Sequence, residues 1–246
     1  MNRVQQQALL RLRTLADPAY RQFNLKLKPS ENRELLGVRM PQIRKLAGQI
    51  VKNGGLEGLM EGLGSVECNE MVLLKAAAFS NLSLPSKEIF DMVLRFIPEI
   101  DGWGACDALA SSLKDAAVHP DEWWNYVKAL FVNPMPYARR LAMVLCLTYF
   151  NDDRHVDEAL SLIGRGDLSH FYVAMGAAWA LSMYFVKFPQ KTASFVQNDL
   201  SSPRVGIMAM TKVLESRQAR GSVRDLARDL RARLKVRLKK SEGMDL

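Results

Sequence analysis

The stretch Phe171-Tyr172-Val173-Ala174-Met175-Gly176-Ala177-Ala178-Trp179-Ala180-Leu181-Ser182-Met183-Tyr184-Phe185-Val186 is the longest apolar run in the chain. It is shorter than the roughly 20 residues that a membrane-spanning helix needs. Its length and composition predict a buried helix over 168–187. Pro189 follows it, and proline is typical of the first turn of a new helix.

The same pattern extends in both directions from this run. Apolar residues recur at helical spacing almost everywhere, strand-like alternation is almost absent, and prolines fall near the expected helix ends. These signals predict an all-α protein. The expected helices cover about 3–15, a second segment ending near 28, 41–52, 55–63, 68–82, 86–97, 102–116, 120–132, 135–149, 153–164, 168–187, 189–199, 202–216 and 222–240.

Short helices with tight connections indicate stacked helix pairs. The step from pair to pair is roughly 35–40 residues, which is in the range of HEAT-like repeats. We therefore expect a single domain over 1–246, folded as a right-handed α-solenoid with a concave groove. The basic helix expected at 222–240 would cap the C-terminal end of the solenoid. The solvent-exposed face of this helix could contact the DNA backbone non-specifically.

Charge is unevenly distributed along the 246 residues. Residues 1–50 carry ten Lys/Arg against three Asp/Glu, a net charge of +7, and residues 217–240 carry ten against two, a net charge of +8. The middle of the chain, 51–216, is net −5. Nucleic acid is the leading candidate partner for such basic ends, although many basic proteins bind none.

The cysteines and histidines give no sign of a disulfide or a metal site. Cys68, Cys106 and Cys146 lie far apart, and the three histidines lack the spacing of a zinc motif. We expect no metal, no cofactor and a reducing, cytoplasmic location. The N-terminus is not a secretory signal, and we expect no membrane association.

The segment Asp101-Gly102-Trp103-Gly104-Ala105-Cys106-Asp107 predicts the start of a helix with Asp101 as N-cap. Trp103 and Asp107 are one turn apart and share a face. An indole face beside a carboxylate attracts cations, although a core aromatic beside a solvated acid is the commoner reason for such a pair.

Asp107, Arg140 and Trp179 are 33 and 39 residues apart, which is about one repeat per step. Side chains at matching places in successive repeats would meet in one groove. Arg140 follows Tyr137 by three residues and could bind a phosphate with both guanidinium arms, or form a structural ion pair instead. Trp179 is the one bulky group among small residues, and could be core or a platform for a sugar or base.

Five segments in this order resemble the AlkD-type DNA alkylation-repair proteins, which are HEAT-like alkylpurine DNA glycosylases. The resemblance covers about 35–217. Its segments are Leu36-Gly37-Val38-Arg39-Met40-Pro41-Gln42-Ile43-Arg44-Lys45-Leu46-Ala47, the Trp103/Asp107 pair, Arg139-Arg140-Leu141-Ala142, Tyr172 to Leu181, and Lys212-Val213-Leu214-Glu215-Ser216.

The resemblance implies a monofunctional glycosylase that hydrolyses the N-glycosidic bond of cationic N3- or N7-alkylated purines in double-stranded DNA, without drawing the base into a pocket. It gives catalytic roles to Asp107, Trp103 and Trp179 and a backbone contact to Arg140. Further DNA contacts are expected at Tyr137, Arg139, Arg44 and Lys45. Gly102 and Met175 depart from the family pattern, where a polar residue and a lysine are usual.

No lysine adjoins the Trp103/Asp107 pair in the sequence, so no Schiff-base lyase step is expected. Two other functions stay open. One is a non-catalytic scaffold that binds damaged or branched nucleic acid, and the other is a HEAT-type protein-interaction array. A carboxylate in a groove facing phosphate favours the enzyme. A capped array is compatible with a monomer, which we expect.

Overall fold

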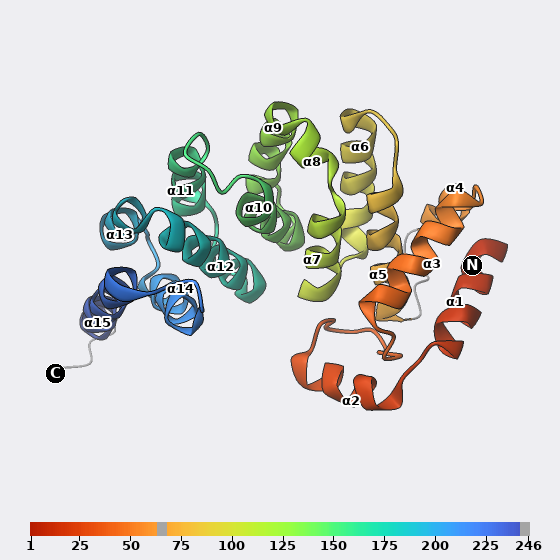
Figure 1. The fold of residues 1–246 in the computed structure, drawn as a ribbon, viewed down its shortest axis with the longest axis horizontal. Coiled ribbons are helices and arrows are strands. Elements are labelled where there is room, and N and C mark those ends of the chain that lie inside the picture. The colour runs from red at the N-terminus through yellow and green to blue at the C-terminus, as the bar shows by residue number, and fades with distance from the viewer. Residues whose placement is uncertain (63–67, 242–246) are drawn as a thin grey trace. The chain divides into compact units, whose positions relative to one another are not determined.

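A computed structural model describes residues 1–62 and 68–241. Its regular structure in those ranges is helical, apart from one isolated bridge between Glu34 and Cys68. The all-α prediction is confirmed. The chain divides into two compact units, Met1–Trp123 and Trp124–Leu246 (Figure 1).

Unit 1 consists of short helices, and residues 28–39 form a longer connection between α2 and α3. Three of them, α3, α5 and α7, pack in a row, and all ten residues of α5 are buried. In contrast, α2 has no buried residue. The elements are α1 (Arg3–Thr14), α2 (Pro18–Leu27), α3 (Met40–Lys52), α4 (Leu56–Met60), α5 (Asn69–Ala78), η1 (Phe79–Asn81), α6 (Ser86–Phe96), η2 (Ile97–Glu99), α7 (Trp103–Ser112) and α8 (Asp115–Val118).

Helix α9 (Pro120–Phe131) carries the boundary between the units. In unit 2, α10, α12, α14 and α15 pack each against the next, while α11 and α13 pack against α12. The elements are α10 (Pro136–Tyr149), α11 (Val156–Arg165), α12 (Phe171–Lys187), α13 (Pro189–Asn198), α14 (Pro203–Glu215) and α15 (Gly221–Ser241). Most of α12 is buried, as its apolar sequence predicts.

Prolines begin several of these helices because their missing N–H costs nothing in the first turn. Pro18, Pro120, Pro136, Pro189 and Pro203 all occupy such positions. The described helices include none that is long and apolar enough to span a membrane.

The helix expected over 102–116 is interrupted. Its backbone leaves the helical region at Leu113, and α8 begins two residues later. The expected helix over 55–63 is shorter, since α4 ends at Met60, and residue 63 lies outside the described residues. Asp115 gives a physical reason for the separate α8, because its carboxylate accepts hydrogen bonds from Ser86 and from Trp123.

Candidate active site

The N-terminus of α7 is held by the segment that follows α2. The backbone N–H of Gly104 donates to the carbonyl of Pro29 at 3.0 Å. The Trp103 indole Nε1–H donates to the carbonyls of Leu27 and Lys28, at 3.3 and 3.0 Å. These carbonyls end α2, and Lys28 closes it in the left-handed conformation. The indole ring is therefore fixed from outside its own helix.

Gly102 and Gly104 allow this close approach. A Cβ atom on Gly102 would collide with the carbonyl of Pro29 and the Cα of Ser30, and one on Gly104 would lie 2.9 Å from the Pro29 Cβ. The glycine that departs from the family pattern at position 102 thus admits the segment that holds Trp103.

Asp101 is not the N-cap of α7, so that prediction is wrong. The N-cap is Gly102, which supplies no side-chain acceptor. The Asp101 carboxylate instead pairs with Arg33 at 2.6 Å and accepts hydrogen bonds from the Ser30 hydroxyl and the Asn32 N–H. Its charge stabilises the loop after α2, because that loop offers a guanidinium and two further donors.

Trp103 and Asp107 line one pocket of about 340 Å³ in unit 1. Each neighbouring helix contributes residues one turn apart: Trp103, Asp107 and Ser111 from α7, Asn69 and Leu73 from α5, Met40 and Arg44 from α3, and Tyr20, Asn24 and Leu27 from α2. Asp107 is half-buried, and Arg44 is exposed. The pocket therefore combines an indole, a carboxylate and a guanidinium, as a receptor for a cationic sugar beside a phosphate requires.

Glu70 supports the floor of this pocket. Its buried carboxylate accepts hydrogen bonds from the backbone N–H groups of Leu36, Gly37 and Val38, at 2.9, 2.7 and 3.3 Å. Val38 lines the pocket. Glu70 thereby fixes the chain just before α3, which carries Arg44.

Asn69 is a site residue that the sequence analysis missed. It is 1% exposed, it lines the pocket, and its Oδ1 has no hydrogen-bond partner within the described residues. A buried acceptor without a partner is available to an N–H or O–H of a ligand or water. Only Ser111 could have been found from the sequence, by extending the Trp103–Asp107 spacing one more turn; Tyr20, Asn24 and Asn69 reach the pocket through tertiary packing.

Lys45 is exposed on α3 but does not line the pocket. Of the predicted site residues, unit 1 therefore brings together Trp103, Asp107 and Arg44. The DNA contact expected at Lys45 stays a prediction.

In unit 2, Trp179 is 36% exposed although both its neighbours on α12 are fully buried. Its ring is therefore accessible to a ligand. Arg140 is only 5% exposed, and its Nη1–H donates to the carbonyl of Tyr172 at 2.7 Å. Arg140 thus joins α10 to the first turn of α12. The phosphate contact expected at Arg140 stays a prediction.

Tyr137 and Arg139 lie beside the same end of α12. The Tyr137 ring stacks on Tyr172 with centroids 6.4 Å apart and meets His170 edge-on at 5.8 Å. Arg139 donates to the carbonyls of Asn133 and Pro134 and pairs with Asp167 at 3.1 Å. Hydrogen bonds from Ser169 and the charge of Arg139 hold the pKa of the Asp167 carboxyl below its usual value.

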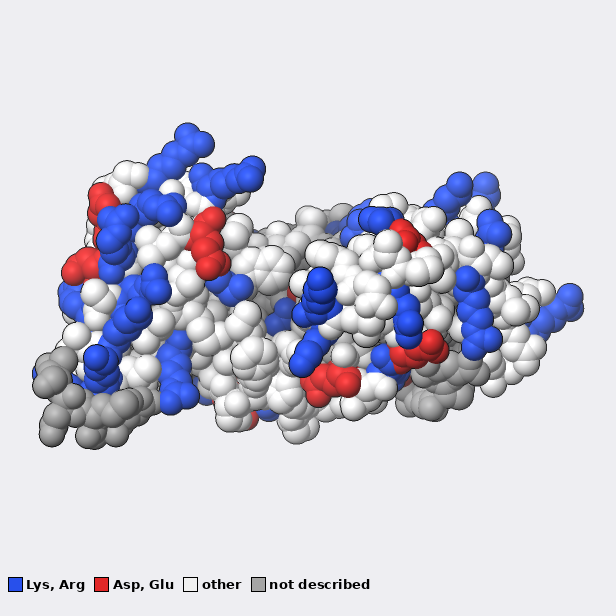
Figure 2. Space-filling model, turned by 90° about the horizontal axis from the view of Figure 1, so that it is seen from below, with Lys and Arg blue, Asp and Glu red and all other residues white. Residues whose placement is uncertain are grey.

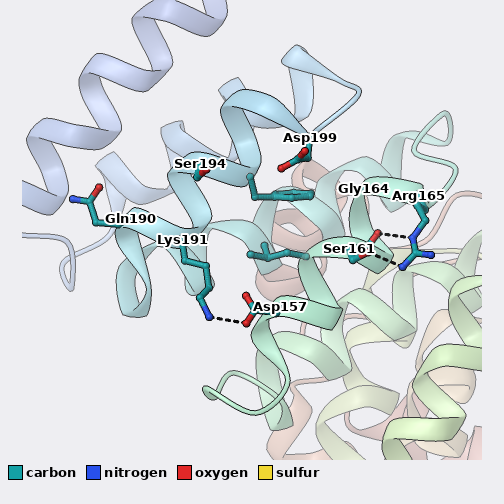
Figure 3. A pocket seen from close by; sticks show the side chains of 10 residues that line it. Asp157, Ser161, Gly164, Arg165, Gln190, Lys191, Ser194 and Asp199 are labelled. Carbon is teal, nitrogen blue, oxygen red and sulfur yellow. Dashed lines mark hydrogen bonds and ion pairs between the residues drawn. The ribbon is translucent and has the colours of Figure 1, made fainter.

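A second cavity, of about 790 Å³, lies in unit 2 between α11 and α13 (Figure 3). None of the predicted site residues lines it. Three of its four charged groups are engaged locally: Lys191 pairs with Asp157 at 2.8 Å, and Arg165 donates to the Ser161 hydroxyl at 2.6 Å (Figure 3). This cavity offers no catalytic arrangement.

The cysteines do not supply a nucleophile. All three are buried, and none of them forms a disulfide. Burial raises the pKa of Cys68 to about 11 and that of Cys146 to about 12, so neither forms a thiolate near neutral pH. The described residues contain no group of three or more His, Cys, Asp or Glu side chains that could hold a metal ion.

A half-buried carboxylate one turn from an aromatic ring, in a pocket with an exposed arginine, fits chemistry on a cationic sugar attached to phosphate. The family model of the DNA alkylation repair enzymes matches residues 8–220. The chain belongs to this family. The match contains every predicted site residue in both units, and it confirms the resemblance to DNA alkylation-repair proteins. No curated protein matches the chain.

Proposed function

We propose that this DNA alkylation repair protein is a monofunctional DNA glycosylase. Its substrates are cationic N3- or N7-alkylated purines in double-stranded DNA, and it hydrolyses their N-glycosidic bond without a cofactor. The observation that carries the proposal is the pocket of unit 1, in which Asp107 and Trp103 face the same space beside Arg44. Family membership supplies the class of damage.

The reaction needs little acid catalysis. Alkylation at N3 or N7 leaves the purine positively charged, so the electron pair of the breaking C1′–N bond neutralises the departing base. Positive charge then develops on the deoxyribose. The Asp107 carboxylate stabilises that charge, and the indole face of Trp103 attracts it. Trp179 is assigned the same role on the basis of the resemblance.

Water completes the hydrolysis. Its oxygen bonds to C1′, and its proton passes to the Asp107 carboxylate and then to solvent. Asn69 and Ser111 line the pocket with Asp107 and offer further polar groups to this water. The products are the free base and an abasic site.

For the whole chain we propose a right-handed α-solenoid of HEAT-like repeats with a concave groove for DNA. The rows of helices packed each against the next within unit 1 and within unit 2 support it. We propose that it acts as a monomer, and an elution volume matching a dimer would contradict this.

The test is base release from methylated duplex DNA by the native protein and by Asp107→Asn. We expect free 3-methyladenine or 7-methylguanine from the native protein and a loss of at least about 100-fold in rate for the variant. Asp157→Asn is the matched control, because Asp157 lines the separate cavity of unit 2. Its rate should equal the native rate.

The alternative is a scaffold that binds damaged or branched nucleic acid without cleaving it. The basic surface of α15 favours this reading. Tight DNA binding with no base released by either the native protein or Asp107→Asn would establish the scaffold. Base release that Asp107→Asn does not change would support the glycosylase activity and refute the proposed role of the carboxylate.

A further inference from the structure

Helix α15 lies beyond the family match, which ends at residue 220, one residue before the helix begins. It carries eight Lys/Arg against two Asp in 21 residues. Its apolar side, Ala227, Leu230 and Leu234, is buried against α14 and α13. Figure 2 shows Lys and Arg side chains gathered at the left of the view, where α15 lies in Figure 1.

Five of the eight cations form one line along the helix. They follow one another at spacings of four, three, four and four residues, which places them on one face. With a rise of about 1.5 Å per residue, the line is about 22 Å long. We call it the α15 stripe, and it consists of Arg224, Arg228, Arg231, Lys235 and Lys239.

The cations of the stripe are mostly available for an external anion. Arg228 pairs with Asp225 at 2.6 Å. The other four have no ion-pair partner among residues 1–62 and 68–241. A row of unneutralised cations repels itself and favours binding of a polyanion.

The remaining three cations, Arg233, Arg237 and Lys240, occupy another side of α15. The Arg237 Nη1–H donates to the carbonyl of Gln197 at the end of α13, at 3.1 Å. This side therefore faces α13, and the stripe faces away from it. The stripe carries five cations and this side carries three, of which Arg233 pairs with Asp229 at 2.7 Å. Three cations can be replaced on either side, which makes each side a control for the other.

We propose that the α15 stripe binds the phosphate backbone of double-stranded DNA, outside the candidate active site. Each strand of a B-form duplex carries one charge per about 3.4 Å of helix axis, so a straight line of five cations about 22 Å long can follow several phosphates. An anionic membrane surface fits less well, because a membrane-surface helix exposes its apolar face, and the apolar face of α15 is buried in the protein. The proposal uses the family's DNA substrate but not the glycosylase activity.

The experiment compares two triple variants of the full chain: Arg224→Gln, Lys235→Gln, Lys239→Gln in the stripe, and Arg233→Gln, Arg237→Gln, Lys240→Gln as the control. Both remove three positive charges, and glutamine has nearly the helix propensity of lysine and arginine. Circular dichroism verifies that the helices remain. Affinity for an undamaged duplex is measured by fluorescence anisotropy across a salt series from about 50 to about 200 mM.

Each phosphate contact contributes about 0.9 to the slope of log K against log salt concentration. We expect the stripe variant to lose about 2 to 3 from the magnitude of that slope and to bind about 10- to 100-fold more weakly, and the control to lose less than about 1. Equal losses in both variants would overturn the proposal, since total charge would then explain them. So would a native protein that does not bind the duplex, or that prefers anionic phosphatidylserine vesicles to it.

The test of the stripe and the test of the glycosylase can give different results. The native protein could release no base while the salt dependence of DNA binding by the stripe variant decreases as expected. In that case the stripe binds DNA and the glycosylase proposal fails. If base is released and the two variants lose slope equally, the glycosylase stands and the stripe proposal fails.

Discussion

Trp103 is held by two backbone carbonyls at the end of α2, so its ring orientation depends on its N–H group as well as on packing. Trp103→Phe keeps an aromatic face and removes this donor. We expect a loss of about 1 kcal/mol in the free energy of unfolding. A ring that can turn away from the sugar should also slow base release by about tenfold with little change in DNA affinity.

Single-turnover base release and urea denaturation measure the two effects. Trp179→Phe is the control for ring size in the denaturation measurement alone, because Trp179 is itself assigned a catalytic role. If Trp103→Phe retains the native rate and stability, the carbonyl contacts do not orient the indole.

Gly102 is the second residue on which the local arrangement depends. Gly102→Ala would push its methyl group into the backbone at Pro29 and Ser30, which cannot move as a side chain can. We expect a loss of about 1–3 kcal/mol in the free energy of unfolding, together with slower base release. Gly176→Ala is the comparison, because its methyl group would meet the nearest side-chain atoms of Arg140 and Met143 at 3.4 Å. Its stability should change by less than about 1 kcal/mol. A neutral Gly102→Ala would mean that the segment after α2 does not pack against α7 as described.

A buried ion pair connects α5 to the segment that leads into α7. Lys75 and Glu99 are 1% and 4% exposed, and the ammonium lies 2.8 Å from the carboxylate. Lys75→Met leaves a buried carboxylate without its partner, so we expect a loss of about 3–5 kcal/mol in the free energy of unfolding. The double variant Lys75→Met/Glu99→Leu should recover most of that loss, because neither charge is then buried alone. Chemical denaturation of the single and double variants measures this, and additive losses would contradict it.

Asp115 ties α8 to α6 and α9 and gives the fold a pH dependence. Burial disfavours ionisation of its carboxyl, but hydrogen bonds from Ser86, Trp123 and His119 outweigh this and hold its pKa below the usual value. A lowered pKa in the folded state adds stability above the unfolded pKa of about 3.9, and that stability is lost as the pH falls through the folded value.

Asp115→Asn lacks this contribution. We therefore expect the variant to be less stable than the native protein at pH 7, and the difference to shrink as the pH falls from about 5 to about 2. Unfolding free energies across that range provide the measurement. A difference independent of pH would show that the ionised carboxyl is not what joins these helices.

Across the whole fold, the sequence alone predicts those helices and helix ends that depend on nearby residues. Proline positions and helical periodicity predict most helices, because each helix end depends on a few neighbouring residues. The break at Leu113 was not predictable in this way, since Asp115 is held by residues of two other helices. The role of Asp101 was missed for the same reason: its partner Arg33 is remote in sequence.

The candidate site was predictable only in part. The one-turn spacing of Trp103 and Asp107 is visible in the sequence, and the structure places both in one pocket with Arg44. Tyr20, Asn24 and Asn69 reach that pocket because α2 and α5 pack beside α7, which no local pattern reveals. Gly102 departs from the family pattern in the sequence, and the close approach of the Pro29 backbone accounts for it.

We propose that this protein cleaves the glycosidic bonds of bases that already carry a positive charge. The most direct measurement is release of free base from two duplexes that differ at one position, 7-methylguanine in one and the neutral base uracil in the other, with the protein in excess. We expect free 7-methylguanine and an alkali-labile abasic strand from the first duplex, and no product from the second. Release of uracil at a comparable rate, or an intact 7-methylguanine strand bound to the protein, would contradict it.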